Sequence, residues 1–540
     1  MSVIGVVALV AACSGSPGSP NATATARECI SVTGGASNVD TGSLADDAMT
    51  LSGEIFLCSD DVVVASPDNL HHVMAGAQLA AALRSPILFP DPLLASELGR
   101  LRPERVHVLG DLEVSVPPGA EVISHTVLEA LDETAAALGS PERVTIGPAI
   151  DATALIATVD AIDTGTRIVG PETEPPVGTA ASVRPEALVE GLAARETEER
   201  LWLVDAADPV TLLFASASVH AVGATVLAVD SGDLLGNPTF VSALAGRDAS
   251  TVRYVGGIPD AATWEINALT RGDQLPGGGF RILTPESPRR YVAFYGHPQA
   301  GSLGALGQQD GPAATLERMQ PLLEAYTADG HRVIPTFEMI ASVAAASAGA
   351  DGDYSTEWPP DTFVPWIEFA AENGMYVVLD LQSGRSDFLS QAKFYEELLL
   401  HPHVGLALDP EWRLESNQVH LEQTGYVEAS EVNQVVHWLA DLVRDNGLPQ
   451  KMLIVHQFKL SMIRNREAIE ERPELQVVIQ MDGEGAEPLK DNTWNVITKD
   501  TDGVHWAWGW KNFFVRDDGG PPTPESTMSK VPTPIFVSYQ

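Results

Sequence analysis

The pattern of hydrophobic positions divides the chain into two long regions. Between residues 54 and 270, short valine-rich runs alternate with alanine-rich stretches of helical character. From residue 291 onward, apolar runs alternate with amphipathic stretches. Strands that alternate with helices are typical of parallel βαβ units. The pattern therefore predicts an α/β protein, with a repeated βαβ region that forms a parallel sheet, followed by a C-terminal (β/α)8-like barrel.

The first region contains an internal repeat. Residues 62–91 and 201–230 align without gaps, and each reads as a strand, an Asp/Pro turn, an alanine-rich helix and a second strand ending in Asp. Later strands at 105–111 and 251–257 also correspond. Such self-similarity indicates a duplicated structural unit. The strands expected at 143–148 and 166–171 are interpreted as the remnant of a further copy.

This pattern resembles the cell wall-binding repeat 2 family, whose members combine a valine-rich strand, an alanine-rich helix, a PILL-type strand and a strand ending in two glycines. The resemblance covers roughly residues 60–260. Asp111 stands where the family has its second glycine. The resemblance implies that the region holds cell-wall polysaccharide or peptidoglycan.

The N-terminus carries an export signal. Residues 3–12 are apolar but too few to span a bilayer, and small residues lead into Cys13. This resembles the lipobox of bacterial lipoproteins, which implies a lipid on Cys13 and anchoring at the extracellular face of the membrane, within the cell wall. An ordinary cleaved signal peptide is the alternative. Either implies an oxidising compartment, so Cys29 and Cys58 are predicted to form a disulfide.

Composition and Gly/Pro-rich segments indicate the domain boundaries. The predicted parts are a signal and linker at 1–27, a wall-binding region at 28–270, a Gly/Pro-rich linker at 271–290 and a barrel at 291–540. The net charge of −41, from 32 basic and 73 acidic residues, argues against nucleic acid as a partner because phosphate is repelled.

The predicted barrel strands begin near residues 291, 332, 375, 404, 451, 475 and 504, with 494–498 as an eighth strand or a helix. In such barrels the active site lies where the strands end. Polar and aromatic side chains gather at these ends. The predicted catalytic residues are Glu338, Asp380, Asp409 and Glu411. The predicted substrate-binding residues are His297, Gln382, His456, Gln480, Asp482, Trp506, Trp508 and Trp510.

Residues 404–412, VGLALDPEW, carry the most specific signal. Asp409 and Glu411 end a buried strand at i,i+2 spacing, which turns both to the same side. The alternative is an Asp that caps the next loop beside an exposed Glu. The D-x-E and the tryptophan-rich last strand resemble family 18 chitinases and family 25 muramidases. That resemblance implies Glu411 as proton donor and Asp409 as its helper. The region also resembles an uncharacterised barrel of actinobacterial wall-associated lipoproteins.

Carboxylates beside tryptophans are typical of a carbohydrate cleft. The sequence thus predicts an exported wall-associated lipoprotein that binds wall polysaccharide and hydrolyses glycosidic bonds without a cofactor or metal. Two alternatives stay open. One is a non-catalytic wall-binding protein with a degenerate barrel. The other is a metal-dependent hydrolase using His297, Glu338, Asp380 and His456, which are residue types that suit zinc. Motifs of the HExxH, CxxC and GxSxG types do not occur.

Overall fold

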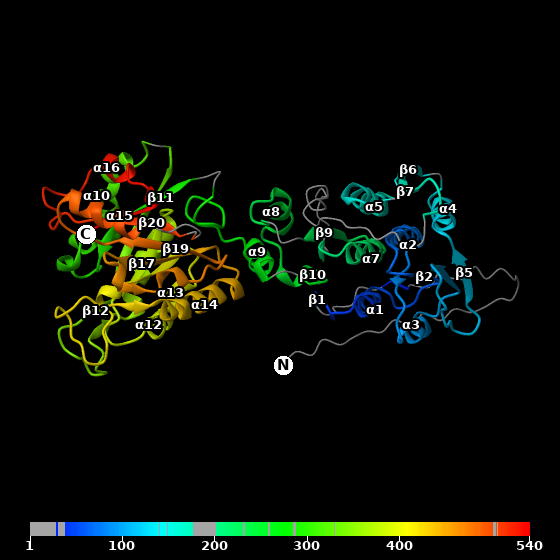
Figure 1. Cartoon of the computed structure of the whole chain (residues 1–540), viewed down its shortest axis with the longest axis horizontal. Coiled ribbons are helices and arrows are strands. Elements are labelled where there is room, and N and C mark those ends of the chain that lie inside the picture. The colour runs from blue at the N-terminus through cyan, green and yellow to red at the C-terminus, as the bar shows by residue number, and fades with distance from the viewer. Residues whose placement is uncertain are drawn as a thin grey trace, which may run out of the picture.

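The computed structural model describes residues 29–30, 38–139, 141–147, 149–175, 201–229, 233–257, 260–284, 288–328, 330–499, 504 and 506–540. These residues form two α/β bodies that follow one another along the long axis of the molecule (Figure 1). The predicted signal segment and Cys13 lie outside the described residues. Within the described part of the chain, no helix is long and apolar enough to cross a membrane.

Three βαβ units build the described part of the N-terminal body. They are β2 (Asp61–Ala65), α2 (Leu70–Leu83) and β3 (Ile87–Leu88); β6 (Glu142–Ile146), α5 (Ala152–Thr164) and β7 (Arg167–Pro171); and β8 (Leu201–Asp205), α7 (Pro209–His220) and β9 (Thr225–Val229). The two strands of each unit pair in parallel, and the three helices contact one another. The middle unit contains the strands interpreted as a remnant, so the repeat occurs three times.

Further strands widen the two outer units. The first becomes a sheet of order β3-β2-β4-β5 and the third a sheet of order β1-β10-β8-β9. The added strands are β1 (Asn38–Val39), β4 (Arg105–Leu109), β5 (Glu121–His125) and β10 (Val252–Val255). The surrounding helices are α1 (Leu44–Ile55), α3 (Leu94–Leu101), α4 (Val127–Leu138), α8 (Pro238–Leu244) and α9 (Asp260–Arg271). The Cys29–Cys58 disulfide, formed as predicted, ties the chain before β1 to the segment after α1.

The repeated sequence features have local structural causes. The side chains of Asn69, Asp151 and Asp208 each accept a hydrogen bond from a backbone N–H at the start of a central helix. Gly110 and Gly256 follow corresponding strands with φ of +105° and +85°. Glycine adopts that backbone conformation without the steric cost of a side chain. The copies therefore share the local features that start each central helix and end each corresponding strand, even where the residues themselves differ.

The C-terminal body is a closed barrel, which confirms the predicted fold. Eight parallel strands of the described region follow in the order β11-β12-β14-β15-β17-β19-β20-β21, and β11 closes the ring by pairing with both β12 and β21. The strands are β11 (Arg289–Gly296), β12 (Arg332–Ala344), β14 (Tyr376–Leu381), β15 (Val404–Leu408), β17 (Lys451–Gln457), β19 (Leu475–Met481), β20 (Ala507–Asn512) and β21 (Phe536–Tyr539).

Helices cover the outside of this ring (Figure 1). They are α10 (Gly311–Ala325), α11 (Val364–Glu372), α12 (Phe388–Phe394), α13 (Glu396–Leu399), α14 (Ala429–Asp445), α15 (Glu487–Ile497) and α16 (Pro524–Met528). A short strand, β13 (Ser355–Glu357), pairs antiparallel with β12, and β16 (Val427–Glu428) pairs with β18 (Ile463–Arg464).

The eighth strand is not at residues 494–498. All but the last of those residues belong to α15, and Thr498 caps its C-terminus. The indole of Trp494 packs on the outward side chains of Trp508 and Trp510, with ring centroids 5.9 and 5.4 Å apart. The strand that closes the barrel is β21, near the C-terminal end of the chain, whose short apolar run the sequence analysis did not single out.

The described residues between α9 and β11, 272–284 and 288, belong to no helix or strand, yet the segment is packed. Leu275 and Ile282 are buried in the same apolar cluster as Tyr291, Tyr376 and Met452, which point into the barrel near the beginnings of their strands. Burying these side chains removes apolar surface from water. The segment therefore closes the end of the barrel opposite to the ends of its strands.

Helix α9 joins the two bodies by hydrogen bonds to the segment that directly follows α14. The indole N–H of Trp264, a buried side chain, donates to the Leu448 carbonyl at 2.9 Å. Arg271 donates to the Asn446 carbonyl at 2.8 Å. A single apolar cluster also runs from the third βαβ unit through α9 into the barrel. The two bodies are thus docked as well as linked.

We expect Trp264→Phe to lower the free energy of unfolding by about 1–3 kcal/mol, because the buried Leu448 carbonyl loses its partner. Denaturant unfolding of the full chain measures this. Trp438→Phe is the control, since Trp438 lies half-buried on α14. Equal losses in the two variants would contradict a specific role for the Trp264 hydrogen bond.

Candidate active site at the ends of the barrel strands

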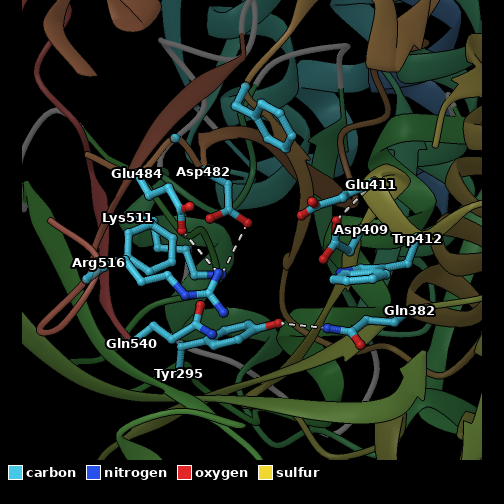
Figure 2. A pocket seen from close by; sticks show the side chains of 13 residues that line it. Tyr295, Gln382, Asp409, Glu411, Trp412, Asp482, Glu484, Lys511, Arg516 and Gln540 are labelled. Carbon is cyan, nitrogen blue, oxygen red and sulfur yellow. Dashed lines mark hydrogen bonds and ion pairs between the residues drawn. The ribbon is translucent and has the colours of Figure 1, made fainter. Parts of the chain in front are cut away.

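A cavity of about 190 Å³ opens where the barrel strands end. Acidic, basic and aromatic side chains share its wall (Figure 2). The lining residues are Tyr295, Gln382, Asp409, Glu411, Trp412, Phe458, Asp482, Gly483, Glu484, Lys511, Phe513, Arg516 and Gln540. The parallel strands bring these positions together although they span most of the barrel sequence.

Asp409 and Glu411 both reach this cavity, but by a turn and not by an extended strand. Strand β15 ends at Leu408, and residues Pro410–Trp412 form a 3-10 turn. The Asp409 carboxylate caps this turn by accepting a hydrogen bond from the Glu411 backbone N–H at 3.1 Å. The capping interpretation is therefore right for Asp409, whereas Glu411 is half-buried and lines the cavity.

Burial raises the pKa of both carboxyl groups. The pKa of Asp409 lies well above its usual range, chiefly because the group is removed from water. Burial also raises the pKa of Glu411, and the negative charge of Asp482 adds to that effect. The negative charge of Glu411 in turn contributes to the raised pKa of Asp409.

Asp482, which directly follows β19, is held as a carboxylate. Its Oδ2 lies 3.1 Å from Lys511 Nζ and 2.9 Å from His456 Nδ1. Burial alone would raise its pKa, but the charge of Lys511 and the hydrogen bond from His456 outweigh burial and lower it. Asp482 and Glu411 face each other across the cavity (Figure 2).

His456 connects Asp482 to a second carboxylate deeper in the barrel. Its Nε2 lies 3.1 Å from Glu338 Oε1 and 3.9 Å from Asp380 Oδ1. Burial would lower the pKa of this imidazole, but the carboxylates of Asp380, Asp482 and Glu338 raise it well above the usual value. His456 thus bridges Glu338 on β12 and Asp482 after β19, and its raised pKa favours the imidazolium form.

Tyr295 lies between the cavity and the buried groups beneath it, which form the floor of the cavity. Its hydroxyl donates to Asp380 Oδ2 at 2.8 Å and accepts from Gln382 Nε2 at 3.3 Å. Lys511 Nζ lies 3.5 Å from the centre of the Tyr295 ring. Burial raises the pKa of Asp380 to about 6.

The positive and negative charges of the buried groups balance only if some of the carboxyl groups stay protonated. Burying an unpaired charge is unfavourable, so the number of ionised carboxylates should equal the number of positively charged bases. Asp380 and Asp409 are the carboxyls whose pKa values rise, which leaves Asp482 ionised beside its two bases. Among the described residues, the network contains the buried residues Glu338, Asp380, Asp409, His456 and Lys511, together with Asp482, whose side chain is 8% exposed.

Most of the predicted site residues meet here. Asp409, Glu411, Gln382 and Asp482 line the cavity, and the others lie beneath it or elsewhere. Glu338, Asp380 and His456 form the floor network described above. Gln480 donates to Ser538 Oγ on β21 at 2.7 Å, inside the barrel.

Two expectations need correction. His297 is buried beside Trp358, with ring centroids 4.2 Å apart, and does not line the cavity. Trp506, Trp508 and Trp510 belong to the apolar cluster between the barrel and its helices, and they do not line the cavity either. The reason is strand parity: successive residues of β20 alternate in direction, so three outward tryptophans leave Lys511 pointing inward.

Several cavity residues were missed by the sequence analysis as site candidates: Tyr295, Trp412, Phe458, Gly483, Glu484, Lys511, Phe513, Arg516 and Gln540. Tyr295 shares the strand parity of the other inward residues, which was an available signal. The residues in loops after strands carry no such periodicity.

Comparison with known proteins identifies no family. No protein-family model matches the chain, and no curated protein matches it significantly. Among solved structures, the chain is similar to Cwp6 from Clostridium difficile, with 13% identity and a TM-score of 0.33 over 64% of this chain and 62% of that one. Cwp8 from the same organism gives 16% identity and a TM-score of 0.33 over 44% and 52%.

A third structure, the Prevotella bryantii endo-beta-mannanase/endo-beta-glucanase, gives 9% identity and a TM-score of 0.25 over 89% of this chain and 59% of that one. The chain thus spans less than two thirds of the length of each of these three proteins.

Proposed function

We propose that this chain is a cell-wall-associated protein whose barrel hydrolyses glycosidic bonds, with Glu411 as the proton donor. The observation that carries the proposal is the position of Glu411, a half-buried carboxyl with a raised pKa in the cavity at the strand ends. Glycoside hydrolysis needs such a group, because the leaving oxygen must take a proton as its bond breaks. A carboxyl with a raised pKa keeps that proton near neutral pH.

The direct test uses the purified full chain with peptidoglycan, chitin and isolated wall polysaccharide. Release of new reducing ends measures hydrolysis of the glycosidic bonds. We expect release from at least one of these polymers. Binding of a polymer without release of reducing ends would support the non-catalytic alternative.

The aromatic wall suits the same substrate class. Trp412 and Phe458 line the cavity, and Trp412 adjoins Glu411 in sequence. Aromatic faces provide large, oriented apolar area for the carbon-bound hydrogens of sugar rings. These residues take the role that the sequence analysis gave to the tryptophans of the last strand.

We expect Trp412→Ala to weaken glycan binding roughly tenfold, a loss of about 1.4 kcal/mol. Titration calorimetry with a soluble wall oligosaccharide measures this. Trp508→Phe is the control, since Trp508 packs on α15 outside the cavity. A tenfold loss in Trp508→Phe, with Trp412→Ala unchanged, would place the sugar on the other side of β20.

Wall and membrane attachment belong to the N-terminal part of the proposal. The region at 28–270 holds wall polysaccharide, the segment at 271–290 links it to the barrel at 291–540, and Cys13 carries the lipid. The triplicated βαβ unit and the sequence around Cys13 support this assignment. The full chain carrying Cys13→Ala should leave the membrane fraction yet sediment with purified cell walls. Failure to sediment would remove the wall-binding role.

A metal-dependent hydrolase is the second candidate. Asp380, Asp409 and His456 offer ligand atoms that all lie within 4.8 Å of one another. His456 Nε2, however, already shares a proton with Glu338, and a bound metal would have to replace that proton. Chelator treatment followed by elemental analysis separates the candidates. Activity that survives metal removal would exclude this second candidate.

A further inference from the structure

We propose that Asp482 is the nucleophile of the barrel, attacking the anomeric carbon on the side opposite to Glu411. This inference rests on the proposed hydrolysis of glycosidic bonds and assigns the second catalytic group of that site. The sequence pattern had placed Asp482 only among the residues that bind substrate.

The first support is position. Asp482 follows β19 and Glu411 follows β15, so the two carboxyl groups come from opposite sides of β17. Both line the cavity, and they face each other across it (Figure 2). A sugar bound between them would present its glycosidic oxygen to one carboxyl group and its anomeric carbon to the other. Most glycosidases use two carboxyl groups that flank the glycosidic bond in this way.

The second support is the hydrogen bonding of Asp482. Among the described residues, Lys511 and His456 both contact Oδ2, at 3.1 and 2.9 Å, and no hydrogen bond reaches Oδ1. Two cationic partners fix the orientation of the carboxylate and keep it ionised. Its Oδ1 lone pairs stay available for bond formation. Glu338 in turn holds His456 from the other side of the imidazole.

The third support is the contrast between the two carboxyl groups. The pKa of Glu411 is raised and that of Asp482 is lowered. Environments that separate two carboxyl groups in this way divide the roles of acid and ionised partner. A carboxylate with a lowered pKa is a weak general base near neutral pH, because a base works best with a pKa near the working pH. Direct attack therefore fits Asp482 better than activation of water.

The reaction then has two balanced steps. In the first, Asp482 Oδ1 bonds to the anomeric carbon, the bond to the leaving oxygen breaks, and that oxygen takes the proton of Glu411. In the second, a water oxygen bonds to the anomeric carbon, and its proton passes to ionised Glu411. The bond to Asp482 breaks, and Asp482 leaves as a carboxylate. Two displacements retain the anomeric configuration.

The test uses the full chain and a panel of 4-nitrophenyl glycosides of glucose, galactose and N-acetylglucosamine. Nitrophenolate leaves without needing a proton, so Glu411→Gln should release it in a burst of about one equivalent per enzyme. Asp482→Asn should release it at least about 10³-fold more slowly than the unchanged chain, because the bond-forming group is gone. Asp518→Asn, on the exposed loop beyond, serves as the control and should retain full activity.

Trapping identifies the nucleophile independently of rates. A 2-deoxy-2-fluoro glycoside of the sugar that the chain cleaves should add its mass to the peptide that contains Asp482. Labelling of another carboxyl group, or an active Asp482→Asn variant, would overturn the assignment while leaving the hydrolase proposal in place. If the unchanged chain cleaves neither the wall polymers nor any glycoside in the panel, the proposed function falls and the assignment with it.

Discussion

Glu411→Gln is expected to lower turnover of wall glycan by about 10²–10⁴-fold while folding and binding persist. Glutamine keeps the shape of the side chain and a hydrogen-bond donor, but it has no proton to transfer at neutral pH. The side chain is half-buried and has no ion pair among the described residues, so its neutral replacement should cost little stability. Reducing-end assays and calorimetry on the same preparation separate turnover from binding.

The pH dependence of turnover should also show that Glu411 is the proton donor. The proton donor is active below its pKa, so turnover should fall as the pH rises through the raised pKa of Glu411. In Glu411→Gln that alkaline limb should disappear from the residual activity. Glu415→Gln, in the exposed loop that follows, is the matched control and should behave like the unchanged chain. If Glu411→Gln stays active while Glu338→Gln or Asp380→Asn is inactive, the acid lies on another strand.

Strand periodicity explains how much of the site could be foreseen. In a closed barrel, inward positions near the strand ends meet in one place, so polar residues there can be found one strand at a time. Glu338, Asp380 and His456 were found in this way, and His456 lies within hydrogen-bond distance of Glu338 and within ion-pair distance of Asp380. Which residues are partners across the barrel could not be foreseen, because strands that are not neighbours approach only when the ring closes. The pairing of Glu411 with Asp482 is of this kind.

Trp506, Trp508 and Trp510 show a second limit of predicting the site from the sequence. Their chemistry suits sugar binding, and their spacing correctly places them on one face. Whether the tryptophans point into the barrel or outward depends on the space available on each side. Ala507, Gly509 and Lys511 point into the barrel, while the large indoles fill the space between the strand and α15. Lys511 on the inward face could have decided the parity, since a lysine facing an apolar helix interface would be costly.

Lys490→Met is expected to lower the free energy of unfolding by about 3–5 kcal/mol. Lys490 lies on α15, and its fully buried Nζ donates to Asp517 Oδ2 at 2.6 Å and to the Lys511 carbonyl at 2.9 Å. Asp517 is buried as well and also accepts from the Phe513 backbone N–H at 2.9 Å. Methionine fills similar space but leaves the Asp517 carboxylate without a cation. Breaking one side of a buried pair therefore costs much more than the pair contributes.

Denaturant unfolding of matched variants tests this account. Lys530→Met removes another lysine beside α15, whose partners Glu487 and Asp491 are 38% and 40% exposed, so it should cost no more than about 1 kcal/mol. Adding Asp517→Asn to Lys490→Met should recover part of the loss, because the uncompensated charge is removed. The same pair ties α15 to the end of β20 and to the loop after it, which place Lys511 and Phe513 at the cavity, so Lys490→Met should also raise KM. Equal losses in the two lysine variants would show that this buried pair does not hold the loop.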